Sequence, residues 1–375
     1  MTKKRNPTFL ILFLLLAMVF ATALVSVNYM TRAIYGFPGK SVSPISALKH
    51  SIMLYQGREE MLAVAPGSGL REEKVTVEPD QSIQQLCLNL EQKNLVASAS
   101  LTCTYLSYSG KDRNIQPGNY TVPMGLNAIK IANLVSDVTR RDKQFVIYAG
   151  WRMEEIATMI DGLGLSFSSA NFLTLATAPP DTYREQLQIP PLLTLEGYFF
   201  PGKYSMKPDI SLEDFVVEIL TRFRTSVITE EFQRDLASSG LTLHEAITMA
   251  SIIQRETLAE EEMATIASVF YNRLAIGMRL ETDPTVQYAL GYDAQANTWW
   301  KSPLTYSDLE VNSPYNTYRY PGLPPGPISN PSLAALSAAV APAETDYLFF
   351  RAKCDGRMTH NFSKTYEEHL DFGCD

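Results

Sequence analysis

The hydrophobic pattern of the chain changes several times between its two ends. An uninterrupted apolar run covers 9–27. Further on, apolar residues recur at every second position in short stretches, which predict strands, and at every third or fourth position in longer ones, which predict helices. The mixture predicts an α+β fold, with a helical anchor at 9–27, a connector at 28–72, a small β-α-α-β domain at 73–140 and a larger mixed domain at 141–375.

The first apolar run is long enough to cross a membrane. Its nineteen residues would span about 28 Å as a helix, close to the thickness of a hydrocarbon core. Lys3-Lys4-Arg5 precede it, so residues 1–8 are predicted to be cytoplasmic and the rest of the chain to lie outside. Ala21-Thr-Ala23 also resembles a signal-peptide cleavage site, but the run is long for such a signal, which favours an uncleaved anchor.

Two further segments precede the larger domain. In the connector, residues 47–64 have a helical pattern and Pro66-Gly-Ser-Gly69 breaks the chain. The small domain combines two strands with two enclosed helices and one following helix, at 75–77, 82–90, 98–107, 117–122 and 128–135.

The larger domain is mainly helical by its pattern. Its prolines predict irregular structure over 163–195. Strands are predicted at 144–148 and at 347–352, the latter pairing with 359–362. Helices are predicted at 153–160, 211–227, 229–240, 242–257, 260–277, 282–291 and 332–340.

Composition narrows the classes of protein. The 375 residues suit two or three domains with a sizeable core, and a net charge of −8 argues against a nucleic-acid surface. Cys87 and Cys103 lie 16 positions apart and Cys354 and Cys374 lie 20 apart, so an exported chain could hold two local disulfides or four buried thiols. The four histidines form no HExxH motif and there is no CxxC pair, so we expect neither a metal nor another cofactor.

One glutamate in the helix at 242–257 suggests chemistry. Thr242 and Glu245 form a capping box at the start of this helix. Met249, Ile252 and Ile253 precede Glu256 by seven, four and three residues, so they share its face. A carboxyl group on an apolar face holds its proton toward neutral pH, as a general acid must. The alternative is a solvated glutamate at a fraying helix end.

Aromatic residues gather in two other places. The segment 195–201 reads Leu-Glu-Gly-Tyr-Phe-Phe-Pro and contains Glu196. Exposed aromatic rings beside a carboxylate suit stacking on sugars, whereas buried ones belong to a core. The loops at 315–318 and 322–328 are polar and aromatic, and the second is stiffened by proline, so it could form a substrate wall beside the helix that carries Glu256.

Several motifs in this order resemble the endolytic murein transglycosylase MltG (YceG-like) family. They are MASIIQRET, SVFYNRL, GMRLETDPTVQYALG, SPYNTYRYPGLPPGPI and HNFSKTYEEH, and the resemblance covers about 73–370. It implies a single-pass anchor in the bacterial cytoplasmic membrane, a LysM-like domain at 73–140 and a catalytic domain at 141–375. It also implies lytic cleavage of nascent peptidoglycan strands between N-acetylmuramic acid and N-acetylglucosamine, with membrane-bound peptidoglycan synthases as partners.

The resemblance places the catalytic acid of the family on Glu256. The candidates for orienting Glu256 or sugar hydroxyls are Glu196, Asn272, Asp283, Tyr288, Asn316, Tyr318 and His360, each of which could equally be a structural cap or core hydrogen bond. The chain departs from the family at Gln254, where the family has an acid, and at Gly202, where it has Asp. Two helical positions differ by about 200°, so Gln254 is predicted to face away from Glu256.

Two other functions remain open at this stage. Asp283 or Glu281 could supply a second carboxylate and make the protein a peptidoglycan hydrolase. The chain could also be a non-catalytic scaffold that binds the cell wall, for which Gln254 and Gly202 are the hints.

Overall fold

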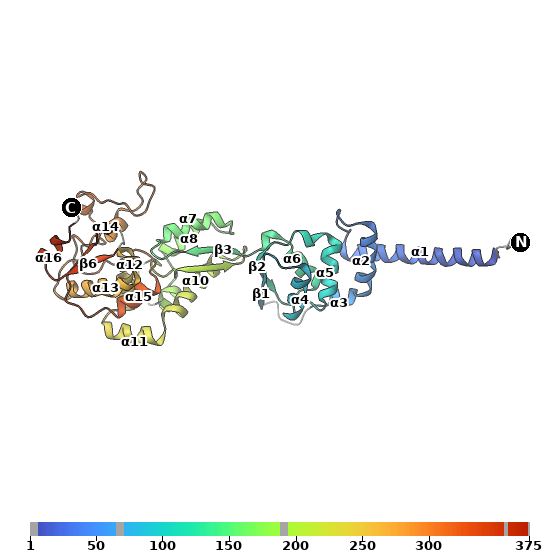
Figure 1. Cartoon of the computed structure of the whole chain (residues 1–375), viewed down its shortest axis with the longest axis horizontal. Coiled ribbons are helices and arrows are strands. Elements are labelled where there is room, and N and C mark those ends of the chain that lie inside the picture. The colour runs from blue at the N-terminus through green and yellow to red at the C-terminus, as the bar shows by residue number, and fades with distance from the viewer. Residues whose placement is uncertain (1–6, 65–70, 188–193, 356–358, 374–375) are drawn as a thin grey trace. The chain divides into compact units, whose positions relative to one another are not determined.

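The computed structural model describes residues 7–64, 71–187, 194–355 and 359–373. The chain divides into two compact units (Figure 1). Unit 1 comprises Met1–Lys143 with Ser205–Pro208, and unit 2 comprises Gln144–Tyr204 with Asp209–Asp375. The predicted α+β class is confirmed, because the described residues form helices together with three two-stranded sheets.

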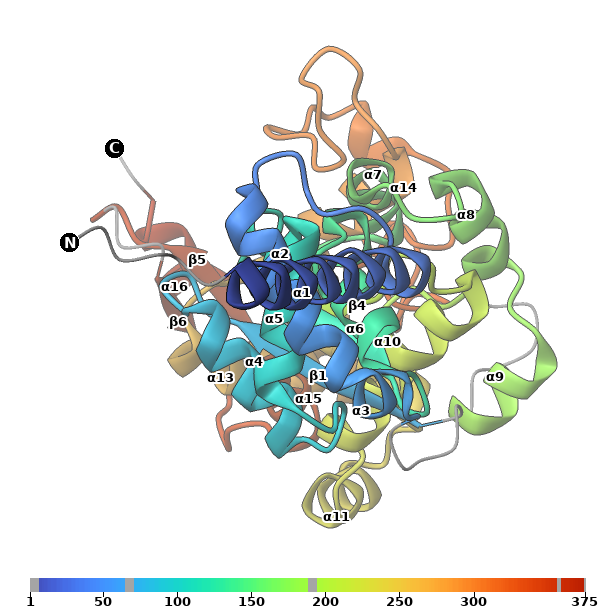
Figure 2. The same ribbon diagram turned by 90° about the vertical axis from the view of Figure 1, so that its right-hand side faces the viewer.

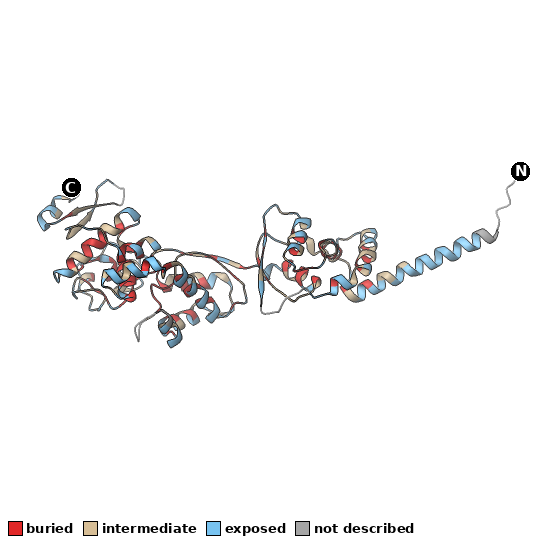
Figure 3. Ribbon diagram, turned by 90° about the horizontal axis from the view of Figure 1, so that it is seen from below, coloured by how far each residue is buried: buried red, intermediate tan, exposed pale blue. Residues whose placement is uncertain are grey.

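Unit 1 begins with a helix longer than the predicted anchor. Helix α1 (Pro7–Tyr35) contains the stretch Leu10–Tyr35, which is long and apolar enough to cross a membrane. Its apolar side chains from Leu10 to Phe20 are exposed (Figure 3). The far end of α1 is anchored in the unit, because the Thr31 hydroxyl donates to the Ser51 carbonyl over 3.0 Å and the Tyr35 hydroxyl to the Leu54 carbonyl over 3.1 Å.

The rest of unit 1 forms a single core beside that helix end. Strands β1 (Glu72–Val77) and β2 (Gly118–Pro123) pair antiparallel, with Val75 opposite Tyr120. Tyr35, Leu54 and Met61 from the expected connector pack into the same core as the strands. The helices of the unit are α2 (Pro44–Gln56), α3 (Arg58–Leu62), α4 (Ile83–Gln92), α5 (Ala99–Ser109), η1 (Lys111–Arg113), α6 (Ala128–Val135) and η2 (Val138–Arg140).

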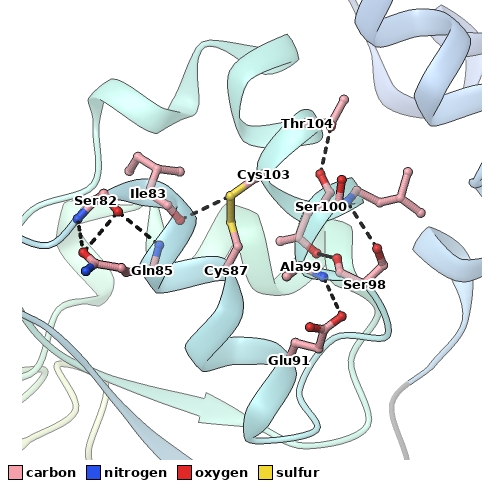
Figure 4. Close-up of a disulfide and its surroundings, with 12 residues drawn as sticks. Ser82, Ile83, Gln85, Cys87, Glu91, Ser98, Ala99, Ser100, Cys103 and Thr104 are labelled. Atoms are coloured by element: carbon pink, nitrogen blue, oxygen red, sulfur yellow. Dashed lines mark hydrogen bonds between the residues drawn. A yellow bond between two sulfur atoms is a disulfide. The ribbon is translucent and has the colours of Figure 1, made fainter.

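One of the two proposed cysteine pairs is a disulfide. Cys87 in α4 and Cys103 in α5 are bonded, and the bond joins the two helices that lie between β1 and β2 (Figure 4). Each helix also has its own start signal, since Ser82 and Ser98 accept hydrogen bonds from the first turns of α4 and α5. Cys374, in the second proposed pair, lies outside the described residues.

Unit 2 is built mainly of helices. Strands β3 (Lys143–Ile147) and β4 (Gly202–Met206) pair, and β5 (Phe349–Ala352) pairs antiparallel with β6 (His360–Ser363) as predicted. The helices are α7 (Met153–Leu163), α8 (Ser169–Thr177), α9 (Asp181–Leu187), α10 (Leu212–Val227), α11 (Glu230–Ser239), α12 (Leu243–Glu256), α13 (Glu260–Ala275), α14 (Asp283–Leu290), η3 (Asp308–Glu310), α15 (Leu333–Val340) and α16 (Tyr366–Asp371).

The prediction of irregular structure over 163–195 was wrong. Helices α8 and α9 occupy much of this stretch (Figure 2). Ser168 and Asn171 form a capping box that starts α8, and Phe172 and Ala176 bury its inner face. The prolines that suggested a loop follow α8, where Pro179 and Pro180 separate it from α9.

Helix α12 is the central element of unit 2. Every residue from Leu243 to Gln254 except Glu245 is buried. The helix packs mainly against α15 and also contacts α13 and α14. Its capping box is present as predicted, with the Thr242 hydroxyl accepting from the Glu245 amide and the Glu245 carboxylate accepting from the Thr242 amide.

The disulfide gives a first testable prediction. It closes a loop of 16 residues, so replacing both cysteines by alanine should lower the free energy of unfolding of unit 1 by about 3 kcal/mol, through the larger conformational freedom of the unfolded chain. Thermal unfolding of the full-length protein in detergent measures this. A reductant should destabilise the wild type more than the double alanine variant; equal stability of the two proteins without reductant would contradict the prediction.

Candidate active site

Glu256 is the last residue of α12, and it lies where the buried face of this helix meets solvent. Met249, Ile252 and Ile253 on the same face are fully buried, whereas Glu256 is partly exposed. The helix stops because Thr257 is extended, and its amide still donates to the Ile253 carbonyl. Among the described residues, none donates a hydrogen bond to the Glu256 carboxyl group. The helix therefore holds the backbone of Glu256, while its carboxyl group is accessible to solvent and has no hydrogen-bond partner among the described residues.

The surroundings of Glu256 favour its protonated form. Desolvation, followed by the nearby negative charge of Asp283, raises the pKa of Glu256 to about 8, although Arg273 and Arg255 oppose the shift. At neutral pH the group consequently carries a proton that it can donate. This is the electrostatic condition for a general acid.

Asp283 belongs to a hydrogen-bonded pair beside Glu256. Asp283 opens α14 and is exposed, and its Oδ1 accepts from the Tyr318 hydroxyl over 2.7 Å. Burial, the bond to Asp283 and the charges of Asp283, Glu256 and Glu281 all raise the pKa of Tyr318, so its hydroxyl remains a donor. Two predicted site residues, Asp283 and Tyr318, are thus brought together with Glu256.

Buried threonine hydroxyls hold this pair in position. The Thr317 hydroxyl accepts from the Thr282 amide over 3.0 Å and lies 2.8 Å from the Thr285 hydroxyl. These contacts attach the start of α14 to the loop that carries Tyr318. Next to them Glu281 has φ +50, an uncommon conformation for a residue other than glycine and one that clusters at functional sites.

Arg273 supplies a positive charge behind Glu256. It lies in α13, is buried, and stacks 5.2 Å from the Phe349 ring. Its guanidinium donates to the carbonyls of Leu348, Arg279 and Leu280 over 2.6, 3.2 and 2.8 Å. Carbonyl oxygens satisfy its hydrogen-bond donors, and its positive charge interacts with Glu281 as well as with Glu256.

The loop segment from 325 to 332 runs along α12. The Ile328 amide donates to the Ser251 hydroxyl, and the Ser332 amide donates to Gln254 Oε1 over 2.9 Å. Gln254 is buried in this contact, which agrees with the prediction that it faces away from Glu256. An acid at this position would accept the same bond, so the substitution preserves the contact.

The proline-rich loop does line a pocket, but at the other end of α12. Leu323, Pro324 and Pro325 line a pocket of about 510 Å³ together with residues at the start of α12, which include Thr242, His244 and Glu245. His244 in this pocket lies twelve residues before Glu256, or about 18 Å along the helix. The pocket is therefore separate from the carboxyl group, and the loop forms no wall next to Glu256.

Glu196 is a buried structural acid. Only 1% of it is exposed, and its two oxygens accept from the Met153 amide over 3.2 Å each. Asn330 Nδ2 lies 3.4 Å from Glu196 Oε1 and also donates to the Trp151 carbonyl. Burial, helped by Glu154, raises the pKa of Glu196 to about 8. Tyr198 and Phe199 beside it are fully buried, which agrees with the alternative that the aromatic rings of 195–201 belong to the core.

Tyr288 lies in an aromatic stack instead of facing Glu256. Its ring is 4.8 Å from that of Tyr315, and the Arg152 guanidinium lies 4.2 Å from its centroid. Burial is the main cause that raises its pKa, followed by the charge of Glu196.

The remaining candidates hold loops. Asn272 donates to the carbonyls of Thr345 and Tyr347, and Asn316 to those of Leu309 and Val311. His360 Nδ1 lies 2.9 Å from Glu262 Oε2, and its amide donates to the same carboxylate. In the described part of the chain, none of the recorded contacts of these three side chains involves Glu256.

Gly202, where the resemblance led us to expect an acid, lies at a crowded position. Its φ is +151, and a Cβ there would lie 2.6 Å from the Arg222 guanidinium. Arg222 instead donates to the Lys203 carbonyl and stacks 4.6 Å from the Tyr204 ring. The space that an acidic side chain would need is occupied by Arg222.

Pattern-based reasoning missed the two arginines near Glu256. Arg255 precedes Glu256 directly, and Arg273 lies one turn from the end of α13. Arg273 falls in the SVFYNRL motif, and its place on a buried helix was the available signal. The contact of Arg255 with Trp300 joins positions 45 apart, which no local pattern reveals.

Comparison with known proteins agrees with these motifs. The model of the YceG-like family matches residues 75–372. A protein named endolytic murein transglycosylase from Bacillus subtilis (strain 168) is 33% identical over 311 residues, covering 79% of this chain and 82% of the relative. One of the same name from Streptococcus pneumoniae serotype 2 (strain D39 / NCTC 7466) is 26% identical, and the match spans 79% of this chain but only 56% of that relative.

A solved structure also resembles this chain in both sequence and fold. The crystal structure of a yceG-like protein from Listeria monocytogenes is similar with a TM-score of 0.56 and 33% sequence identity. The match covers 80% of this chain and 99% of the Listeria chain.

The charge of Asp283 gives a second prediction. Because this charge raises the pKa of Glu256, Asp283→Asn should lower that pKa, while the amide oxygen can still accept from Tyr318. Carbon-13 NMR of labelled glutamate carboxyl groups, with the Glu256 signal assigned through Glu256→Gln, measures the titration. The exposed Asp181→Asn on α9 is the matched control and should leave the pKa near 8. An unchanged or higher pKa in Asp283→Asn would contradict the assignment of the charge.

Proposed function

Because the chain belongs to the YceG-like family, we propose that it is a membrane-anchored lytic transglycosylase that cleaves the glycan strands of peptidoglycan. The relatives from Bacillus subtilis and Streptococcus pneumoniae that carry the name endolytic murein transglycosylase support this activity. The observation that carries the proposal is the Glu256 carboxyl group, which is partly exposed, is protonated at neutral pH and receives no hydrogen bond from the described residues.

A single such glutamate suffices for a lytic reaction. Protonated Glu256 donates its proton to the oxygen that joins C1 of N-acetylmuramic acid to N-acetylglucosamine, and this bond breaks. The resulting carboxylate takes the proton of the muramic acid C6 hydroxyl, whose oxygen bonds to C1. The product ends in 1,6-anhydro-N-acetylmuramic acid, no water is consumed, and Glu256 is protonated again.

The neighbours of Glu256 assist both halves of this cycle. The Asp283 charge keeps Glu256 protonated before cleavage and stabilises positive charge that develops on the sugar ring. Arg273 favours the carboxylate form that follows proton donation. Tyr318 holds Asp283 in place through its hydroxyl. The balance of these opposite charges lets one group act as acid and then as base.

The rest of the chain presents this site to new glycan. The basic residues before α1 favour a cytoplasmic N-terminus, and with this orientation unit 2 and the part of unit 1 that follows α1 would lie outside the cytoplasmic membrane. The arrangement β1-α4-α5-β2 with an antiparallel strand pair supports a LysM-like domain at 73–140, and residues 141–375 then form the catalytic domain. Cleavage close to the membrane would end strand elongation, so membrane-bound peptidoglycan synthases are the expected partners.

A hydrolase is the second candidate, favoured by one observation. Asp283 lies near enough to Glu256 to raise its pKa, so a carboxylate pair is present. Glycoside hydrolases use one carboxyl group as acid and another as base or nucleophile. The two reactions differ in their products, since hydrolysis gives a reducing end that is one water heavier than the anhydro end.

The proposed role of Glu256 gives a third prediction. The full-length wild type in detergent should release anhydro-ended fragments from uncrosslinked glycan strands, and Glu256→Gln should lower the rate by at least about 10²-fold because its amide cannot donate a proton in this way. Mass spectrometry of the fragments measures both outcomes.

A control variant and three contrary results make this prediction testable. The exposed Glu231→Gln on α11 should keep full activity. Reducing ends from the wild type would favour the hydrolase, the absence of any cleavage would favour a scaffold, and full activity in Glu256→Gln would overturn the assignment of the acid.

A further inference from the structure

Arg255 lies directly before the proposed acid, and it forms no ion pair with any described residue. Its guanidinium stacks 3.7 Å from the centroid of the Trp300 ring. Its Nε is buried without a hydrogen bond, and its one recorded bond, from an Nη atom to the Gly150 carbonyl, is long at 3.5 Å. Among the described residues, no carboxylate lies within ion-pair distance of it. A half-buried cation is thus left with open donors beside Glu256.

The nearby Arg152 differs from Arg255, because Arg152 has an ion-pair partner. Arg152 also stacks on aromatic rings, at 4.2 Å from Tyr288 and 4.7 Å from Trp299. However, its guanidinium is paired with Glu154, with Nε at 3.1 Å from the carboxylate. Glu154 thus forms an ion pair with Arg152, whereas the charges of Glu155 and Glu256 act on Arg255 only from beyond ion-pair distance, and no carboxylate in the described part of the chain pairs with it.

The position of Arg255 is fixed by its surroundings. Trp300 is held by the bond from its Nε1 to Glu155 Oε2 over 3.1 Å, and the same oxygen accepts from the Arg152 amide over 2.9 Å. Gly150 has φ +81, and a Cβ there would lie 3.2 Å from an Nη atom of Arg255. Glu155 is consequently committed to Trp300 and α7, while Gly150 leaves room for the guanidinium.

We propose that Arg255, held by Trp300, is a substrate-binding residue for a carboxylate of the peptide stem that muramic acid carries. The proposal rests on the proposed function, because it takes the glycan strand as the substrate. A guanidinium presents planar, paired donors that match a carboxylate, and it gains most where no protein anion competes. Neutral, protonated Glu256 does not compete for it, so the stem carboxylate is the anion that would complete the charge balance.

Substrates that differ only in the stem test this subsite. The full-length enzyme in detergent is given uncrosslinked strands with intact stems, the same strands stripped of stems by an amidase, and strands whose stem carboxylates are amidated. For intact strands, Arg255→Gln should raise KM by about tenfold with a smaller change in kcat, and Arg255→Lys should have an intermediate effect. For stripped or amidated strands, the three proteins should have the same KM. The exposed Arg234→Gln on α11 is the matched control.

Binding measurements separate this proposal from the proposed function. In a Glu256→Gln background, affinity for intact and stripped strands is compared with and without Arg255→Gln, so no cleavage is needed. If the wild type does not cleave glycan strands, the proposed function is wrong, but the binding result for Arg255 still stands. Equal weakening of binding for intact and stripped strands would overturn the subsite, and so would an unchanged affinity for intact strands. Thermal unfolding of Arg255→Gln at the wild-type temperature shows that the variant is folded.

Discussion

The burial of α12 is the constraint on which the rest of unit 2 depends. A helix with almost every residue buried must be covered on all sides, and α13, α14, α15 and the segment 325–332 supply that cover. Glu256 lies at the end of α12, where the elements that pack around this helix no longer bury it completely. Its carboxyl group is attached to a helix whose residues are almost all buried and still reaches solvent, which is the combination that a precisely placed acid requires. Each fully buried apolar side chain on its face contributes about 1.5–3 kcal/mol, so the position of Glu256 is strongly enforced.

Electrostatics around Glu256 follow from how its neighbours are satisfied. Arg273 is bound by backbone carbonyls and Asp283 by a tyrosine hydroxyl, so both keep their full charge. The two charges oppose each other at Glu256, and desolvation decides the outcome in favour of the proton. The same logic gives Glu196 a raised pKa, yet Glu196 is sealed from solvent and tied to Met153 and Asn330. Accessibility, more than pKa, separates the proposed acid from the structural one.

The amino-acid pattern predicted α4 to α7 and α10 to α15 because their signals are local, but it missed α9 and α16. Capping residues such as Thr242, Ser98 and Ser211 fix the start of a helix within three positions, and the hydrophobic period identifies its buried face. The same signals failed for α8, where Ser168 and Asn171 cap a short helix between proline-rich segments. The expected connector contributes to a core because Tyr35 and Leu54 find partners that are distant in sequence.

Site residues were harder to predict than helices, because polar side chains near an active site resemble those that hold loops. Asp283 and Tyr318 come together with Glu256, whereas Asn272, Asn316 and His360 serve backbone carbonyls or a glutamate elsewhere. The sequence motifs contain residues near Glu256 and residues that only hold loops, and they do not distinguish the two groups. Only the partners of each side chain separate them, and these partners depend on contacts between distant segments. Arg255 and Trp300 illustrate this point, since neither position alone indicates a role.

Oxygen isotope labelling tests the central claim most directly. If Glu256 works alone through the C6 hydroxyl, strands cleaved in water enriched in oxygen-18 should give new muramic acid ends that carry no label, because the bond to C1 is made by an oxygen of the sugar. Incorporation of one labelled oxygen at C1 would show that water is the attacking group and would contradict the one-glutamate lytic mechanism.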